Sequence, residues 1–443
     1  MKPFLTILTG ILALGLVSCD NSSTTTTTKS SVAKLSAFSF AKNDSLPGLA
    51  AAVFTVEERL DTGYVWNKDS MLYGTRLDTV VPKFTFAATP GSAYLRTSDT
   101  VCALTGYDTL NFTKLPIYLT IRSADGTNTK TYEIHPTVHQ VDPDLYTWKQ
   151  LTDGIYPEDD SEQRVLVLND SFVMIKSNGF ELHAYQSEDG AIWTDLGEPT
   201  GLPDGTKVRQ IVSDETMLYY GDELYVYTSD DAITWTAHSV SKPIITMVMV
   251  WNWAVWALVD NDGQELAVWD GTDVQLTGLR TGEDFPVSDF AAVCFNSASE
   301  RERAMIIGGF AENGRSLNSR WNIEYSPHIK ENGGYRLEEF SIDRPHFTSL
   351  TGVSVIWYNH QLLMFGGVDA DMTYFGRDIL ISNDEGLNWT KADTTKNQLP
   401  AVYNARQKQT AIVVDNTIYL FGGQSRSTTY SDVYQGRLNS IDW

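Results

Sequence analysis

Apolar residues fall in short runs along this chain, and turn-forming residues separate them. Between residues 35 and 141 the runs are four to seven residues long or alternate with polar positions, as in 130–134. Strict alternation over such lengths is typical of a half-buried strand. Asp125-Gly126, just before that segment, is a residue pair favoured in tight hairpin turns. We therefore predict a small β-sandwich over residues 35–141, and a linker follows it at residues 142–145.

The remaining residues repeat. A proline recurs ahead of an apolar run, at Pro157, Pro203, Pro243, Pro286, Pro345 and Pro400. Each run is followed by a polar turn and a second strand, and three of these second strands end in Gly-Gly, at 308–309, 366–367 and 422–423. Units of roughly 40–50 residues with four short strands each predict a β-propeller. The fold class is thus all-β, with a six-bladed propeller over 146–443 after the sandwich.

The two ends of the repeat region complement each other. The last unit stops at Trp443 before an outer strand, and Tyr146–Leu151 (YTWKQL) resembles the outer strand of the first unit, Trp193–Leu196. We predict that these ends pair and complete one blade.

Three turns between the third and fourth strands share an acidic residue and a tryptophan. The pairs, in our alignment, are Glu188 with Trp193, Asp230 with Trp235, and Asp384 with Trp389. The third turn resembles the Asp-box pattern S-x-D-x-G-x-x-W in full, whereas the other two depart from it. In such a turn the carboxylate accepts backbone N–H bonds and the tryptophan packs between blades. The motif occurs in sialidases away from their chemistry, so it implies a fold and not an activity, as do the kelch-like Gly-Gly strands.

The amino terminus predicts export. Lys2 precedes an apolar run from Phe4 to Val17, too short to span a bilayer, and the run ends in Leu16-Val17-Ser18-Cys19. This resembles a bacterial lipobox, which implies a signal peptide over 1–18 and a lipid on Cys19 that anchors the chain to a membrane. Residues 19–34 are rich in Ser and Thr and predict a tether. We expect an outer-membrane lipoprotein of the bacterial envelope, with both the periplasmic and the surface leaflet open.

Charge and composition exclude several classes of partner and cofactor. The formal charge is −23 and no basic block is present, which argues against nucleic acid. The histidines show no metal-ligand spacing and no glycine-rich phosphate loop follows a strand, so we predict neither metal nor organic cofactor. Cys102 and Cys294 lie in apolar strands and are expected to be buried and unbridged.

Arginines follow the prolines at matching distances. Arg164 lies seven residues after Pro157, Arg209 six after Pro203, and Arg406 six after Pro400. In a six-bladed ring these units are neighbours, so the three guanidiniums could converge at the channel mouth and hold a carboxylate or other anion. Alternatively, each arginine pairs with a nearby acid. The same loops contain further candidate ligand contacts, namely Lys207, Asp289, Arg344, His346 and Tyr403.

The lipobox, the tether, the hairpin ADGTNTKTYEI and the propeller that begins DPDLYTWKQL together resemble a lipoprotein family of gut-dwelling Bacteroidetes. The hairpin is similar to the closing hairpin of Ig-like or cadherin-like sandwiches. The family is often labelled as cell-adhesion proteins, which implies a non-enzymatic binding or adhesion protein whose propeller recognises a glycan or a protein. The alternatives are a sialidase-like or other glycoside-processing enzyme and a subunit of an outer-membrane complex. The nearest string to the sialidase F/Y-R-I-P motif, Ile342–Pro345, departs from it at two positions.

Overall fold

The computed structural model describes residues 28–46, 48–98, 101–104, 109–156, 161–297, 301–341 and 349–442. The chain divides into two compact units, residues 1–141 and 142–443. Among the described residues the helical segments are three 3-10 turns, η1 (Val208–Gln210), η2 (Asn332–Gly334) and η3 (Asn439–Asp442). None of these offers the length and apolarity that a bilayer crossing requires.

The first unit is a β-sandwich. A two-stranded sheet, β1-β4, lies with a six-stranded sheet in the order β2-β3-β8-β7-β5-β6. All pairs are antiparallel except β3 with β8, which run parallel. The strands are β1 (Leu35–Phe40), β2 (Phe54–Glu57), β3 (Thr62–Asn67), β4 (Pro82–Phe86), β5 (Ser92–Arg96), β6 (Val101–Ala103), β7 (Ile117–Arg122) and β8 (Thr129–His135).

The core of this sandwich is aromatic, and its tightest hairpin lies where the sequence predicts it. Phe38 and Phe40 of β1 pack edge-on against Phe54 of β2, with ring centroids 4.7 and 5.5 Å away. β7 and β8 form a hairpin whose turn is held by the Asp125 carboxylate, which accepts hydrogen bonds from the backbone and the hydroxyl of Thr127. Such short side-chain-to-backbone bonds fix the turn and therefore the register of the two strands.

The predicted tether ends earlier than residue 34. The carbonyl of Ser30 accepts a hydrogen bond from the Asp125 backbone N–H, and the carbonyl of Ser31 accepts one from the Asn128 side chain. Ala33 packs against the sandwich core. Residues from Ser30 onward therefore belong to the sandwich, because the β7–β8 turn supplies partners for their backbone.

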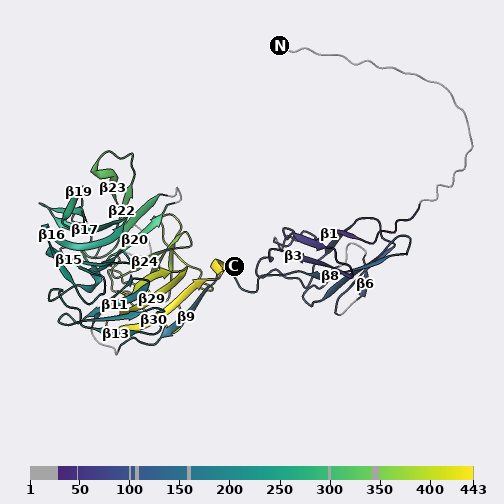
Figure 1. The fold of residues 1–443 in the computed structure, drawn as a ribbon, viewed down its shortest axis with the longest axis horizontal. Helices are drawn as coiled ribbons and strands as arrows, with labels where there is room; N and C mark the ends of the chain where they lie inside the picture. Colours follow the sequence, from purple (N-terminus) through teal and green to yellow (C-terminus); the bar gives the residue numbers. More distant parts are fainter. Residues whose placement is uncertain are drawn as a thin grey trace, which may run out of the picture. The chain divides into compact units, whose positions relative to one another are not determined.

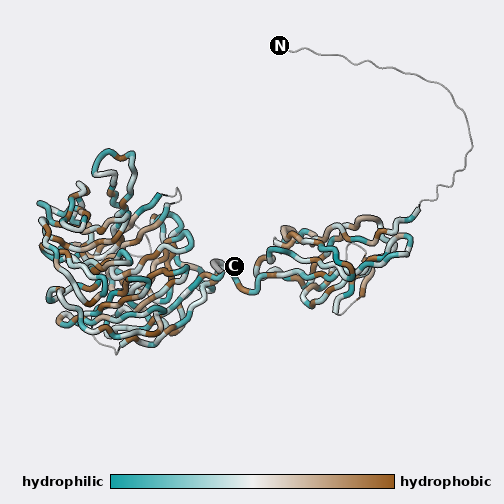
Figure 2. Tube along the Cα trace, in the orientation of Figure 1, coloured by the Kyte–Doolittle hydropathy of each residue, from teal (hydrophilic) through white to brown (hydrophobic). Residues whose placement is uncertain are grey.

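The second unit is a β-propeller. Its sheets are β10-β11-β12-β13, β14-β15-β16-β17-β18-β19, β20-β21-β22-β23, β24-β25-β26-β27 and β28-β29-β30-β9. Figure 2 shows hydrophobic segments running through the strands of this unit, with hydrophilic segments in its loops. The strands are β9 (Tyr146–Thr152), β10 (Glu162–Leu168), β11 (Ser171–Ser177), β12 (Leu182–Ser187), β13 (Thr194–Gly197), β14 (Val212–Ser213), β15 (Leu218–Ser229), β16 (Thr236–Trp251), β17 (Ala254–Asp260), β18 (Gln264–Trp269), β19 (Val274–Arg280), β20 (Ala291–Asn296), β21 (Glu302–Ile307), β22 (Ser319–Tyr325), β23 (Tyr335–Ser341), β24 (Ser354–Tyr358), β25 (Gln361–Phe365), β26 (Leu380–Ser382), β27 (Thr390–Lys391), β28 (Thr410–Val414), β29 (Thr417–Gln424) and β30 (Thr429–Leu438).

Six inner strands surround one central channel. In chain order, β10, β14, β16, β20, β24 and β28 each contact the next, and β28 contacts β10, so the ring is closed. All six contribute residues to the wall of a single cavity. The propeller therefore has six repeat units.

The last sheet joins the two ends of the unit. β9 pairs antiparallel with β30, and Trp148 lies opposite Gly436. Figure 1 shows the two strands side by side. The missing side chain at Gly436 gives room to the Trp148 ring, because a Cβ there would lie 2.3 Å from the indole.

The second and third units differ from the predicted pair of separate blades. They share one six-stranded sheet, because β16 pairs with β15 through its first part and with β17 through its second part. Pro243 lies in this 16-residue strand, where the pairing with β15 shifts register between Ser239 and Ile244. Proline cannot donate to a ladder and is tolerated at such an irregularity. The 16 residues of β16 contain no glycine and no turn, so the chain passes directly from the second unit into the third.

Candidate functional site

The central channel encloses a cavity of about 440 Å³, and its two ends differ in chemistry. Charged residues gather where the inner strands begin: Glu162, Arg164, Lys207, Arg209 and Asp289 all line this end. The sequence predicted Arg164, Arg209, Lys207 and Asp289 as neighbours, and the ring brings them to one cavity. We refer to this region, together with Lys408, as the charged end.

Arg209 reaches across the ring. It lies in η1 of the second unit, yet its Nε is 3.2 Å from Oδ1 of Asp289, in the loop that precedes the fourth unit. Its Nη1 donates to the carbonyl of Lys408, in the loop that precedes the sixth unit, at 2.6 Å. The second, fourth and sixth units alternate around the ring, so one guanidinium ties three loops together over the channel. Arg209 therefore closes this end rather than lining an open mouth.

Lys408 completes the charged end and was not predicted. Its Nζ forms ion pairs with Glu162 of the first unit and with Oδ2 of Asp289, the latter at 3.3 Å. Its backbone N–H donates to the carbonyl of Gly352 in the fifth unit. A sequence signal exists, since Lys408 follows Arg406 by two residues in the same loop. Which of the two side chains reaches the channel depends on the loop conformation.

Arg164 differs from the other cations of this site. Within the described part of the chain its guanidinium makes no hydrogen bond or ion pair, and its Nε is inaccessible to solvent. Burial, and then the positive charge of Arg209, lower the pKa of Arg164 to about 10. The side chain is still charged at neutral pH. The residue as a whole is half-buried, but its Nε is cut off from solvent without a protein partner, so this position is suited to an anion that arrives from outside.

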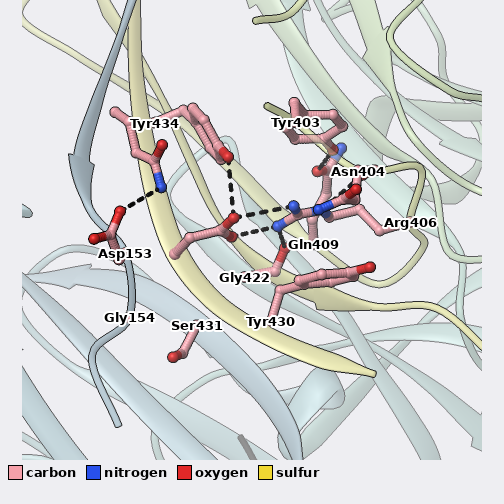
Figure 3. A network of polar contacts seen from close by, with 12 residues as sticks. Asp153, Gly154, Tyr403, Asn404, Arg406, Gln409, Gly422, Tyr430, Ser431 and Tyr434 are labelled. Atoms are coloured by element: carbon pink, nitrogen blue, oxygen red, sulfur yellow. Dashed lines mark hydrogen bonds and ion pairs between the residues drawn. The ribbon is translucent and has the colours of Figure 1, made fainter. Parts of the chain in front are cut away.

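Arg406 and Tyr403 do not belong to the channel, which corrects the predicted cluster. The guanidinium of Arg406 is 1% exposed and forms two hydrogen bonds with the Asp432 carboxylate. It also donates to the carbonyl of Gly422 and lies over the ring of Tyr430, 3.9 Å from the centroid. Figure 3 shows Arg406 within this network.

Burial is the largest single influence and would lower the pKa of Arg406, but the hydrogen bonds to Asp432 and the electrostatic attraction of Tyr403, Asp432 and Tyr434 together outweigh it, so the pKa is raised. Tyr403 is buried against Arg406, with the guanidinium carbon 4.4 Å from its ring centroid. The predicted alternative, in which each arginine pairs with an acid, thus holds for Arg406 and for Arg209.

The other predicted residues lie in several places. Cys19, Arg344 and His346 lie outside the described residues. Cys294, predicted to be buried, is exposed in the channel wall, where its thiol donates to the carbonyl of Val250 at 3.5 Å. Cys102 is half-buried, and neither cysteine forms a disulfide. In the described part of the chain, no three His, Cys, Asp or Glu side chains are grouped as a metal site requires.

Comparison with known proteins assigns a family. Residues 142–443 match the "DUF6242 beta propeller domain", and residues 18–135 match the "Domain of unknown function (DUF6242) N-terminal domain". The chain belongs to the DUF6242 family. A solved structure, "Structure of YjhT", is similar over 63% of this chain and 95% of its own, at 14% identity and a TM-score of 0.45. No curated protein matches the chain.

The acidic turns of the DUF6242 propeller are built by different residues from those aligned above. In the first turn Asp189, not Glu188, accepts the backbone N–H bonds of Ala191 and Ile192. In the second turn Asp231, not Asp230, accepts those of Ile233 and Thr234. Both turns are one residue shorter than the Asp384 turn, so the alignment by tryptophan shifted the acid by one position.

The tryptophans take the predicted place in all three turns. The indole N–H of Trp193 donates to the carbonyl of Gly190, that of Trp235 to Ala232, and that of Trp389 to Gly386. Trp193 also packs edge-on against Phe421 of the sixth unit, with centroids 6.0 Å apart. The acidic turns thus connect neighbouring sheets.

The shift by one residue is testable. Asp189→Ala is expected to lower the free energy of unfolding by about 1 kcal/mol at pH 7, because two backbone N–H groups lose their acceptor. Glu188→Ala, at the exposed neighbouring position, should change it by less than about 0.5 kcal/mol. Urea unfolding of both variants measures the difference, and an equal loss in the two would restore the original alignment.

The same pair has a pH dependence of known sign. The backbone N–H bonds from Ile192 and Ala191 lower the pKa of Asp189. The stabilisation is therefore present above the unfolded pKa of about 3.9 and is lost as pH falls through the lower folded value. The difference in the free energy of unfolding between the wild type and Asp189→Ala should become smaller below about pH 4.

Proposed function

We propose that this DUF6242 chain is a lipid-anchored binding protein of the bacterial envelope and that its propeller channel holds an anionic ligand without transforming it. The observation that carries the proposal is the unpartnered guanidinium of Arg164 in the wall of a 440 Å³ cavity. Cavities of this size hold small molecules. The ligand is thus a small carboxylate or similar anion, free or at the end of a glycan.

The charge balance at this end supports an anion. Arg209 and Lys408 are neutralised by Asp289 and Glu162, with which they form ion pairs. Arg164 and Lys207 add two positive charges with which no described acid pairs; Lys207 is exposed to solvent, whereas the Nε of Arg164 is not. An anionic group would reduce this imbalance and form charge-assisted hydrogen bonds with the guanidinium.

The geometry favours binding over catalysis. A glycoside-processing enzyme needs one carboxylic acid free to donate a proton and a second group to stabilise or attack the sugar. Glu162 and Asp289, the acids of the charged end, are both engaged by Lys408. Engaged carboxylates hold Lys408 and Arg209 in place, so their role here is to position the cations.

The anchor and the envelope location rest on the amino-terminal sequence. A signal-like apolar run ends at Cys19, and a Ser/Thr-rich segment separates it from the first described residues. A lipid on Cys19 would hold the propeller near the membrane, at a distance that the length of that segment limits. In this proposal the sandwich is a spacer, and adhesion or uptake is a consequence of ligand binding in the channel.

Calorimetric titration of the full chain tests the channel. Two carboxylates, octanoate and glucuronate, are each compared with the uncharged counterparts 1-octanol and glucose. At least one carboxylate should bind, and Arg164→Gln should weaken it at least tenfold, since the charge-assisted bonds are lost. Arg76→Gln, an exposed arginine of the sandwich, is the matched control and should bind as the wild type does.

A second readout separates a ligand contact from a structural residue. Arg164→Gln should leave the free energy of unfolding of the ligand-free protein unchanged or raise it, because a half-buried cation without a partner among the described residues is removed. Equal affinity for the charged and uncharged members of each pair would contradict the proposal, as would a large loss of stability in Arg164→Gln. Cys19→Ala in the same preparation should release the protein from the membrane fraction.

A further inference from the structure

The residues of the channel wall indicate the chemical nature of the ligand's body as well as its charge. Resting on the function proposed above, we propose that the ligand is an amphiphilic carboxylate, with one anionic group at Arg164 and an apolar body that extends along the channel toward Cys294. The charged end, the wall and the opposite end each contribute to this inference.

The charged end limits the ligand to one anionic group and excludes its body. Arg164 has a solvent-inaccessible Nε without a partner among the described residues, and one anionic group would supply that partner; Lys207, the other cation there without an ion pair, is exposed to solvent. Arg209 bridges to Asp289 and to the Lys408 carbonyl, and Gln210 Nε2 donates to the carbonyl of Val287 at 3.2 Å. These bonds close the charged end, so the rest of the ligand lies on the other side of Arg164.

Beyond Arg164 the wall combines the polar residues Ser213 and Glu215 with apolar side chains of modest size. The apolar side chains come from five different inner strands and include Val167, Val250, Ala292, Val355, Ala411 and Ile412. Methyl and methylene surfaces of this kind favour an apolar body, which gains free energy on leaving water in proportion to the area it buries.

Three polar side chains of this wall are already used between neighbouring units. The hydroxyl of Ser213 donates to the carbonyl of Val167 at 2.6 Å, and that of Ser354 donates to the carbonyl of Gln409. Thr410 Oγ1 accepts the backbone N–H of Val165. A sugar ring would have to bury several hydroxyl groups here with these side chains engaged elsewhere, which is unfavourable. The observations thus favour an alkyl or similar body over a sugar.

Cys294 marks the end of the channel away from the charged end. It lies in β20 beyond Ala291 and Ala292, its side chain is exposed, and it lines the same cavity as Arg164. An apolar body that fills the channel would cover it. Cys102 in the sandwich provides an internal reference, because it is also outside any disulfide and lies in the other unit.

The experiment uses the full chain with octanoate, 1-octanol and glucuronate. By calorimetry octanoate should bind, with 1-octanol at least tenfold weaker and glucuronate at least tenfold weaker. Arg164→Gln should weaken octanoate at least tenfold, whereas Arg76→Gln should not. The heat-capacity change for octanoate should be negative, as burial of apolar surface requires.

Alkylation followed by peptide mass spectrometry locates the ligand. Saturating octanoate should slow the modification of Cys294 at least fivefold and leave Cys102 unchanged. Binding of octanoate without protection of Cys294 would place it outside the channel and overturn the inference.

The remaining outcomes separate the two proposals. Arg164-dependent binding of glucuronate with none of octanoate would overturn the amphiphile and leave the anion-binding function standing. If neither carboxylate responds to Arg164→Gln, both proposals fall. Equal binding of octanoate and 1-octanol would show that the anionic group contributes nothing, which also contradicts both.

Discussion

Replacing Arg406 by alanine is expected to lower the free energy of unfolding of the propeller by about 3–5 kcal/mol. The guanidinium is 1% exposed and holds the Asp432 carboxylate of β30, the strand that pairs with β9. Without it, Asp432 is left buried with the Tyr434 hydroxyl as its remaining described side-chain donor. A buried carboxylate that loses its cation costs far more than the pair contributes, because its desolvation is no longer offset.

Urea unfolding followed by tryptophan fluorescence measures this effect, and a double-mutant cycle assigns it. Arg406→Ala, Asp432→Ala and the double variant should show a coupling of about 1–3 kcal/mol, so that the double variant is less destabilised than the sum of the single ones. Arg315→Ala breaks a half-exposed pair with Asp284 and should cost less than about 1 kcal/mol. A loss of that small size for Arg406→Ala would mean that the closing sheet does not depend on the ion pair.

Trp389→Ala is expected to cost about 3–5 kcal/mol as well, but through lost packing. The indole is 1% exposed and lies in a cluster with Met305 and Ile307 of the fourth unit and Leu362 and Met364 of the fifth. Its N–H donates to the carbonyl of Gly386, so the substitution also removes one of the hydrogen bonds of that turn. The cavity would lie between the sheets of the fourth and fifth units. We expect the surrounding side chains to fill little of it.

Trp253→Ala is the matched control for this substitution. Trp253 is at the tip of the β16–β17 turn, fully exposed, with φ at +60°. Its removal should change the free energy of unfolding by less than about 0.5 kcal/mol. Trp251, two residues earlier, is buried, so the sequence Trp251-Asn252-Trp253 contains one core residue and one surface residue. Equal losses for Trp389→Ala and Trp253→Ala would contradict the packing between units.

Two arginines at matching places after a proline thus have opposite roles. Arg406 has a carboxylate, a carbonyl and aromatic rings around it, and it stabilises the fold. Arg164 has no described partner, and we assign it to the ligand. Stability measurements distinguish the two roles. Loss of Arg406 should destabilise the sheet, whereas loss of Arg164 should weaken ligand binding without lowering stability.

The match to the DUF6242 family assigns no function to the channel. We propose that the channel binds an anion and that this anion has an apolar body. The anion depends on Arg164, while the apolar body depends on wall residues such as Ala292 and Ala411. Lipid anchoring at Cys19 remains a prediction from the amino-terminal sequence.

The sequence by itself determined the all-β class, the sandwich and the six repeat units of the propeller. Period-two alternation, the Asp125-Gly126 turn and the recurrence of Pro, Gly-Gly and Trp are local properties, and a strand or tight turn follows from neighbours within a few residues. The pairing of β9 with β30 could also be predicted, because an unpaired strand edge at each end of a ring calls for a partner.

Only the tertiary structure decided which side chains meet. The acid of the first turn, Asp189 and not Glu188, depends on a turn one residue shorter than the motif. Whether Arg406 or Lys408 reaches the channel depends on the path of one loop. Arg209 forms hydrogen bonds with Asp289 and Lys408, which lie 80 and 199 residues further along the chain. Local patterns carry no information about such distances, because the closed ring of six repeat units sets them.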